Sequence, residues 1–364
     1  ADGKTLNKRE GLLVGLRSAS GAEGWGEIAP LEALFSESNL EARERSEFVL
    51  KRWTDSIQRS PGADDFTAAA FGKARFLEDA FWKELLPDFK KVPSVRCGFE
   101  MAFSSLAAAE QRIPVRTWIN KGASHSAVKT SLLLEAGSES FLDEGTAAYA
   151  RGFRVFKVKI ARAEAHLEQE SIRCLAERFP DIRLRLDANR HLNDAAFKEW
   201  LAASARWPVE YWEEPFQDEA ALDRFEAPFA VDESLRGVTA SAPQNVWEAE
   251  LDKLPKTIEV WIVKPAMLGS LKSLFFLSEL AVKKKKKLVL SSTFETRLGL
   301  SFWAEGSAVL EKSSGGMVSG LGTLDYFSRD LCLPEKDRAE PDFQPRPLPF
   351  SSADLNVDLV KRLL

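Results

Sequence analysis

Residues 155–160 read VFKVKI, and residues 183–189 read RLRLDAN. Both stretches alternate apolar and polar residues, which is typical of β-strands because successive side chains on a strand point to opposite faces. In the first stretch this alternation places Lys157 and Lys159 on one face, so two ammonium groups point in the same direction. An edge strand with a solvated lysine face is the ordinary interpretation of such a pair. The charged residues at the ends of the neighbouring predicted strands favour a buried site instead.

Short apolar strands recur along the chain from about residue 128, with amphipathic helical stretches between them. A series of strand-plus-helix units favours a closed parallel barrel over an open doubly wound sheet, and no GxGxxG follows any of the strands. The sequence therefore predicts an α/β protein with a parallel (β/α) barrel of seven or eight units. We expect the strands at 130–134, 153–160, 182–187, 210–213, 229–232, 258–264 and 287–292 and near Met317.

The first part of the chain has a different pattern. Residues 11–29 predict a hairpin around a Gly/Ser turn, and helical spacing of apolar residues follows. We expect an α+β capping domain over residues 1–115, the barrel over 116–325, and a segment over 326–364 that packs back on the capping domain.

Composition narrows the class of function. The chain has 364 residues, and 50 Lys and Arg against 55 Asp and Glu give a formal net charge of −5. This balance offers no positive field for nucleic acid or an anionic membrane, so a small molecule is the expected partner. Three cysteines without a CxxC pair favour a reducing compartment. No stretch is apolar enough to span a membrane, and we expect a cytoplasmic protein.

Three consecutive predicted strands end in acids, namely Asp187, Glu213 and Asp232. At the C-terminal ends of adjacent barrel strands these carboxylates would converge on one point. Three crowded carboxylates repel one another unless a hard cation neutralises them, and oxygen ligands suit Mg²⁺. The competing interpretation is that each acid caps the helix after its strand. One such cap is ordinary, but three at equivalent positions favour the metal.

The next strand ends in Lys264, followed by a proline that stops the strand. Lysines on two strands thus flank the three acids, which predicts a metal between opposed amines. A divalent metal on a substrate carboxylate would stabilise the charge formed when a base removes the α-proton. Lys159 can be that base if burial and the like charge of Lys157 favour its neutral form.

The chain resembles the enolase superfamily in its muconate-lactonizing subgroup, and within it the o-succinylbenzoate synthase family. The barrel motifs that carry the resemblance are Lys157-Val158-Lys159, Asp187-Ala188-Asn189, Glu213-Glu214-Pro215, Asp232-Glu233-Ser234 and Val263-Lys264-Pro265. Arg9-Glu10-Gly11, Gly24-Trp25-Gly26-Glu27 and Arg96-Cys97-Gly98 resemble the capping domain of the same family.

The resemblance implies a Mg²⁺-dependent syn-dehydration of 2-succinyl-6-hydroxy-2,4-cyclohexadiene-1-carboxylate to o-succinylbenzoate in menaquinone biosynthesis, with Mn²⁺ as a substitute metal. Lys159 would be the base and then the acid for the hydroxyl that leaves from the same side. Lys157 would lower its basicity, and Lys264 would hold the enediolate from the opposite face. The other implied residues are the metal ligands Asp187, Glu213 and Asp232, the succinyl-carboxylate contacts Ser291, Ser292 and Gly320, and the polar groups Arg185 and Asn189 behind the metal.

Other functions use some of the same residues. Racemisation of an N-acylamino acid would need the same lysines and acids, and the sequence leaves it open as an alternative. Dipeptide epimerisation is disfavoured because residues 319–323 carry no Asp-x-Asp. A metal-free aldolase with a Schiff base on Lys159 or Lys264 would leave the three acids unexplained. A non-catalytic barrel would leave all of these residues unexplained.

Overall fold

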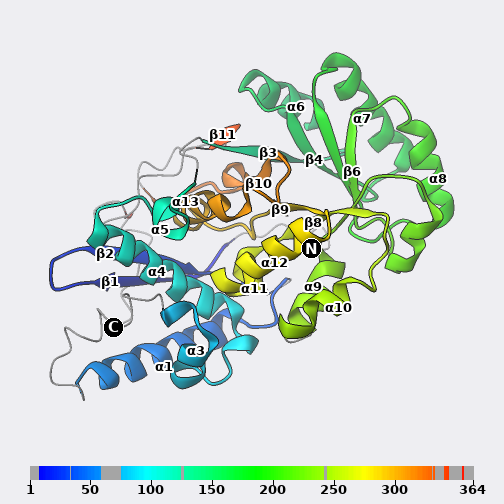
Figure 1. Cartoon of the computed structure of the whole chain (residues 1–364). Helices are drawn as coiled ribbons and strands as arrows, with labels where there is room; N and C mark the ends of the chain where they lie inside the picture. Colours follow the sequence, from blue (N-terminus) through cyan, green and yellow to red (C-terminus); the bar gives the residue numbers. More distant parts are fainter. Residues whose placement is uncertain are drawn as a thin grey trace.

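The computed structural model describes residues 8–32, 34–58, 75–123, 127–241, 244–329, 331–332, 340–343 and 355. Its main sheet contains eight parallel strands (Figure 1). They are β3 (Val128–Glu135), β4 (Val155–Lys159), β5 (Arg183–Asp187), β6 (Val209–Glu213), β7 (Phe229–Val231), β8 (Ile258–Val263), β9 (Lys287–Leu290) and β10 (Ser319–Gly322). The strand order is β10-β3-β4-β5-β6-β7-β8-β9, and a parallel bridge between Ser291 and Gly320 brings the two ends together. The predicted barrel is confirmed.

Helices cover the outside of the barrel because the strands turn one apolar face toward them. Leu184 and Leu186 of β5, for example, are fully buried in the same apolar cluster as Phe197 and Trp200. The short chain between β6 and β7 holds only the 3-10 helix η3 (Glu219–Arg224). The other elements of this region are α6 (Phe141–Ala150), α7 (Ala165–Arg178), α8 (Asp194–Ala203), α9 (Glu233–Ser241), η4 (Gln244–Val246), α10 (Trp247–Leu251), α11 (Pro265–Leu268), α12 (Leu271–Lys283), α13 (Arg297–Gly306), η5 (Ser307–Leu310) and η6 (Leu324–Tyr326).

The N-terminal region contains the predicted hairpin and a group of helices. Its elements are β1 (Leu12–Arg17), β2 (Glu23–Ile28), α1 (Asn39–Gln58), η1 (Arg75–Leu77), α3 (Asp79–Leu85), η2 (Phe89–Lys91), α4 (Pro93–Gln111) and α5 (Val115–Ile119). Strands β1 and β2 pair antiparallel, and α4 packs across β2. A Cβ atom on Gly26 would overlap the carbonyl oxygen of Gly98, so both glycines permit this close approach. The contact holds β2 close against α4.

The expected domain limit, between residues 115 and 116, would fall within the first turn of α5. Most of the C-terminal segment that we expected on the capping domain lies outside the described residues. Within the described part, β11 (Asp342–Phe343) pairs antiparallel with β3 of the barrel, and Cys332 bridges to Leu355.

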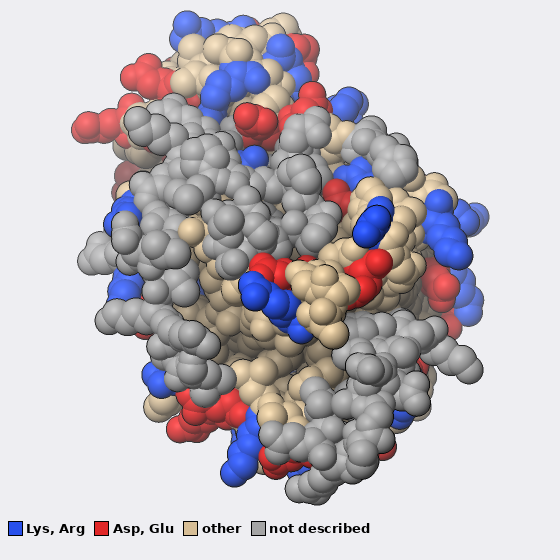
Figure 2. Space-filling model, turned by 90° about the vertical axis from the view of Figure 1, so that its left-hand side faces the viewer, with Lys and Arg blue, Asp and Glu red and all other residues tan. Residues whose placement is uncertain are grey.

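On the face shown in Figure 2, acidic and basic side chains of the described residues alternate, and neither sign forms an extended patch. None of the described helices combines the length and the apolar character required to cross a bilayer.

Candidate active site

Strand register brings the predicted site residues to one end of the barrel. Lys159 on β4 pairs with Asp187 on β5, which pairs with Glu213 on β6. These three residues close their strands, so their side chains form one layer at the C-terminal ends, where barrel enzymes have their active sites. Lys157 and Arg185 pair with each other one layer deeper.

Ion pairs join the acids and lysines of this end. Asp187 Oδ2 lies 2.6 Å from Lys159 Nζ and 2.8 Å from Lys157 Nζ. Lys157 Nζ also lies 2.7 Å from Glu213 Oε1. On the other side of the site, Lys264 pairs with Asp232. Three carboxylates and three ammonium groups thus form one buried and balanced cluster.

This arrangement differs from three carboxylates gathered around one cation. In the part of the chain that the structure describes, no group of three acidic, histidine or cysteine side chains has the layout of a metal cage. The physical reason is that crowded buried carboxylates need positive charge, and the lysine ammonium groups supply it here.

The donor set nevertheless fits Mg²⁺. Asp187, Glu213 and Asp232 offer only oxygen atoms, which this hard cation prefers. Within the described residues, Oε2 of Glu213 is buried and has no hydrogen-bond partner. A buried carboxylate oxygen without a partner is costly, and a cation would satisfy it. These three residues could therefore hold the metal.

The cluster shifts the pKa values of its members in different directions. Burial lowers the pKa of Lys159, and the charge of Lys157 adds to this effect, although Asp187 opposes it. Burial acts on Lys157 in the same sense, but Asp187, Glu213 and Asp232 outweigh it and raise the pKa of Lys157. The two neighbouring lysines thus become unequal, and Lys159 is the one more easily converted to a neutral base.

The acids are also unequal. Burial and the charge of Asp187 raise the pKa of Glu213 to about 7. Burial opposes the ionisation of Asp187, but Lys157 and Lys159 outweigh it and hold the pKa of Asp187 well below its usual range. Asp187, which contacts both lysines, is therefore the acid of the site that stays ionised most readily.

One large cavity opens above this cluster and reaches the N-terminal region. The predicted residues that line it are Lys157, Lys159, Asn189, Asp232, Lys264, Ser291, Ser292 and Gly320. Asn189 accepts a hydrogen bond of 2.7 Å from Lys159. Asp187 and Glu213 are absent from the cavity lining, and each is 1% exposed.

Arg185 does not line this cavity. Its guanidinium donates to Glu210 at 2.6 Å and to the carbonyl oxygen of Val318 at 3.0 Å, and it lies over the ring of Tyr211. Because these partners hold its guanidinium inside the barrel and the residue is 1% exposed, Arg185 supports the barrel interior rather than offering a contact to a ligand.

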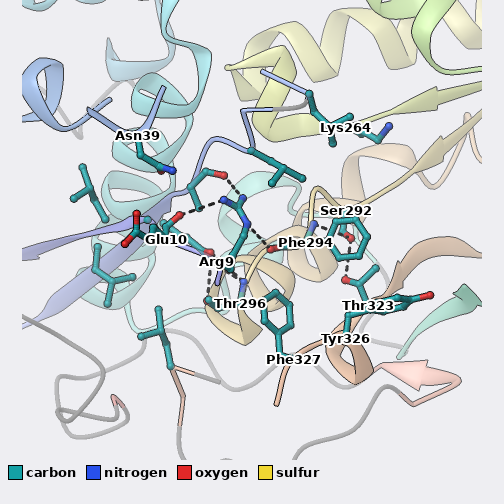
Figure 3. A pocket seen from close by; sticks show the side chains of 18 of the residues that line it. Arg9, Glu10, Asn39, Lys264, Ser292, Phe294, Thr296, Thr323, Tyr326 and Phe327 are labelled. Carbon is teal, nitrogen blue, oxygen red and sulfur yellow. Dashed lines mark hydrogen bonds between the residues drawn. The ribbon is translucent and has the colours of Figure 1, made fainter. Parts of the chain in front are cut away.

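Ser291, Ser292 and Gly320, the residues predicted to contact the succinyl carboxylate, lie together, and Ser291 forms a parallel bridge with Gly320. The backbone N–H of Ser292 donates to the carbonyl oxygen of Gly320 at 3.0 Å. The hydroxyls of Ser292 and Thr323 lie 2.9 Å apart. Thr323, for which the sequence predicts no role, therefore fixes the Ser292 hydroxyl beside the cavity (Figure 3).

Glu214 is a second residue at the site for which the sequence predicts no separate role. Its buried carboxylate accepts the backbone N–H groups of Asp232 at 2.9 Å and Ser234 at 2.7 Å, and it pairs with Arg190. It also adopts a positive φ of 39°, which is uncommon for a residue with a side chain. Glu214 thus holds the end of β7 at the site. A second acid directly after the strand end was the only signal in the sequence.

Two buried glutamates dock the N-terminal region on the barrel. Glu27 at the end of β2 accepts hydrogen bonds from the backbone N–H of Thr296 at 3.0 Å and of Gly299 at 3.1 Å, at the start of α13. Glu100 on α4 accepts the backbone N–H of Leu271 at 2.8 Å, at the start of α12. Each carboxylate thus satisfies unpaired N–H groups at a helix N-terminus and complements the helix dipole.

These glutamates predict a pH dependence of stability. Burial raises the pKa of Glu27 to about 7 from its usual 4.5, and the charge of Glu295 adds to this effect, while the hydrogen bonds from Thr296 and the charge of Arg9 oppose it. The folded state therefore holds a proton that the unfolded state releases, so this stabilising contribution is lost as the pH rises through 7. Between about pH 5 and 8, we expect wild type to lose roughly 1–3 kcal/mol of unfolding free energy relative to Glu27→Gln in urea denaturation.

Glu47→Gln, at an exposed position of α1, is the control and should follow wild type at each pH. Parallel pH profiles for wild type and Glu27→Gln would contradict the prediction.

Comparisons with known proteins agree with this geometry. Residues 2–78 match the family described as MenC, N-terminal domain, and residues 141–243 match Enolase C-terminal domain-like. The chain is 27% identical over 343 residues to an o-succinylbenzoate synthase from Yersinia pseudotuberculosis serotype O:3, which covers 92% of this chain and 89% of the relative.

Solved structures share the fold. A probable mandelate racemase from Alicyclobacillus acidocaldarius superposes with a TM-score of 0.70 at 22% identity, covering 96% of this chain and 88% of that one. A dipeptide epimerase from Methylococcus capsulatus, solved with a Mg ion, superposes with a TM-score of 0.66 at 20% identity, covering 88% and 87%. With a MenC N-terminal domain, an enolase-like barrel and similarity over nearly its whole length, the chain belongs to the enolase superfamily, in its o-succinylbenzoate synthase family.

Proposed function

We propose that this chain dehydrates 2-succinyl-6-hydroxy-2,4-cyclohexadiene-1-carboxylate to o-succinylbenzoate, with Lys159 as the group that moves the proton. The observation that carries the assignment is the contact of Lys159 with Asp187 and Asn189 at the floor of the cavity. This contact fixes the amine in position, while burial lowers its pKa. A general base works best when its pKa lies near the operating pH.

The proton and the hydroxyl leave from one side of the substrate ring in this scheme. Lys159 removes the hydrogen on the carbon next to the ring carboxylate, and the electron pair of that C–H bond forms the new ring double bond. The C–O bond at the neighbouring carbon breaks, and Lys159 returns its proton to the departing hydroxyl, which leaves as water. Aromatisation of the ring favours the products.

Asp187, Glu213 and Asp232 would hold Mg²⁺, which when bound stabilises negative charge on the substrate carboxylate. Lys264 pairs with Asp232 on the other side of the site and lines the same cavity, so its ammonium group would stabilise that charge from the opposite face.

Charge balance supports an anionic substrate. With Lys159 neutral as the base, the ammonium groups of Lys157 and Lys264 and the three carboxylates leave one negative charge in the site. A divalent cation turns this into one positive charge, which a substrate carboxylate would offset in this buried place. Ser291 and Ser292, near Gly320, would receive the carboxylate of the succinyl group.

The direct test is a spectrophotometric assay of the purified protein with the cyclohexadiene substrate. We expect turnover with added Mg²⁺, loss of turnover with EDTA, and recovery when Mg²⁺ is restored in excess. Turnover that persists after complete chelation would contradict the metal site. Absence of turnover in all conditions would contradict the reaction, and an N-acylamino acid, assayed by loss of optical rotation, would then test the racemase alternative.

A further inference from the structure

Arg9 joins the N-terminal region to the loop that follows β9. Its guanidinium donates to the carbonyl oxygens of Phe294 at 3.3 Å and Thr293 at 3.4 Å. It also donates to Pro30 at 2.9 Å and to Ala29, both directly after β2. One planar fork therefore clamps backbone segments from both domains, as Figure 3 shows.

The clamped loop has a strained conformation. Phe294 adopts a φ of 61°, a left-handed value that costs energy for a bulky residue and persists only where surrounding contacts impose it. Arg9 bonds to the carbonyl group of this same residue. The loop is also held by Glu295, whose carboxylate accepts from the N–H and hydroxyl of Thr293 at 2.7 and 2.6 Å.

This conformation determines where the proposed substrate contacts lie. The backbone N–H of Phe294 reaches back to the hydroxyl of Ser292 at 3.4 Å, and that hydroxyl contacts Thr323. The ring of Phe294 packs edge-on against Tyr326, with ring centroids 5.5 Å apart. Arg9, Ser292, Phe294 and Tyr326 all line the cavity or border it, yet Arg9 is in contact with none of the acids and lysines that would do the chemistry.

We propose that Arg9 is a positioning residue for substrate binding, which holds the strained loop after β9 so that Ser292 faces the carboxylate of the succinyl group. The proposal rests on the proposed function for the identity of the substrate. It assigns to Arg9 an effect on binding rather than on proton transfer, because the arginine acts through the loop.

The variant Arg9→Lys distinguishes the positioning of the loop after β9 from a mere neutralisation of nearby carboxylates by positive charge. The lysine keeps a positive charge beside Glu27 and Glu295, but its single ammonium cannot replace the planar fork at both backbone segments. We expect KM for the cyclohexadiene substrate to rise about tenfold, with kcat changed by less than about threefold. Hydrogen exchange measured by mass spectrometry should become faster in a peptide that covers residues 291–296.

Arg96 provides the matched control. It is a buried arginine of the N-terminal region that pairs with Glu100 and Asp79 and reaches Ser270 of the barrel at 2.9 Å, away from the cavity. Arg96→Lys should lower stability without changing KM or exchange in residues 291–296. Equal effects of the two variants, or an unchanged KM in Arg9→Lys, would overturn the proposal.

A double-mutant cycle tests the mechanism even if Arg9→Lys is poorly stable. Phe294→Gly removes the cost of the positive φ, so Arg9→Lys should speed exchange less in that background than in wild type. Additive effects would overturn the proposal. The exchange measurement needs no turnover, so a failure of the proposed reaction would appear as an inactive wild type and remain distinct from a failure of the Arg9 role.

Discussion

Lys159→Ala is expected to lower kcat/KM for the cyclohexadiene substrate by at least about 10³-fold, because the variant loses both the base and the acid of the proposed reaction. Of the two neighbouring lysines, Lys159 is the one whose pKa burial lowers. Lys157 cannot replace it as the base, because the acids around Lys157 raise its pKa. Steady-state kinetics at saturating Mg²⁺ measures the effect.

The fold should survive this change, since Lys159 lines a cavity and its removal leaves Asp187 paired with Lys157. Circular dichroism and thermal unfolding check this point. Lys129→Ala, at an exposed lysine on the neighbouring strand β3, is the matched control and should keep wild-type kinetics. A rate within tenfold of wild type for Lys159→Ala would remove Lys159 from the role of base.

Asp187→Asn is expected to weaken Mg²⁺ binding by at least about 100-fold, because it removes a buried negative charge from the proposed ligand set. Asp187 stays ionised because the charges of Lys157 and Lys159 lower its pKa. Isothermal titration of the purified protein with MgCl₂, without substrate, measures the affinity directly.

Asp181→Asn is the control at the opposite end of the same barrel region. Asp181 lies just before β5, is 54% exposed and pairs with Arg154 at the surface. This variant should bind Mg²⁺ as wild type does. If Asp187→Asn retained wild-type affinity, the three carboxylates would not be the metal ligands, and the proposed site would have to be abandoned.

The barrel and the composition of its active end could be predicted from sequence because the signals are local. Alternation with a period of two places Lys157 with Lys159 on one face, and it does not depend on the rest of the chain. Equivalent strand ends in a parallel barrel then bring Asp187, Glu213 and Asp232 to one end. These acids and lysines do lie together, although as ion pairs rather than as an open set of carboxylates.

Alternation alone could not tell how deep a residue lies along its strand. Arg185 shares a face with Asp187, yet it lies one layer lower and pairs with Glu210 inside the barrel. Both residues keep the same register with β6, since Arg185 pairs with Tyr211 and Asp187 with Glu213. What differs is the set of side-chain partners: Glu210 and the carbonyl oxygen of Val318 hold the guanidinium inside the barrel. These partners come from other parts of the chain, so alternation within one strand could not reveal them.

By itself, then, the sequence determined the barrel, the hairpin and the set of acids and lysines, because each follows from periodicity within one strand or from spacing between successive strands. Only the tertiary structure decided how Arg9, Glu27 and Glu214 serve the site. Arg9 and Glu27 contact residues near Thr296 in the other domain, and Glu214 reaches the end of the next strand. Such hydrogen bonds satisfy backbone groups exposed at strand and helix ends. Those of Arg9 and Glu27 form only after the two domains pack together, and that of Glu214 forms only after β6 and β7 lie side by side.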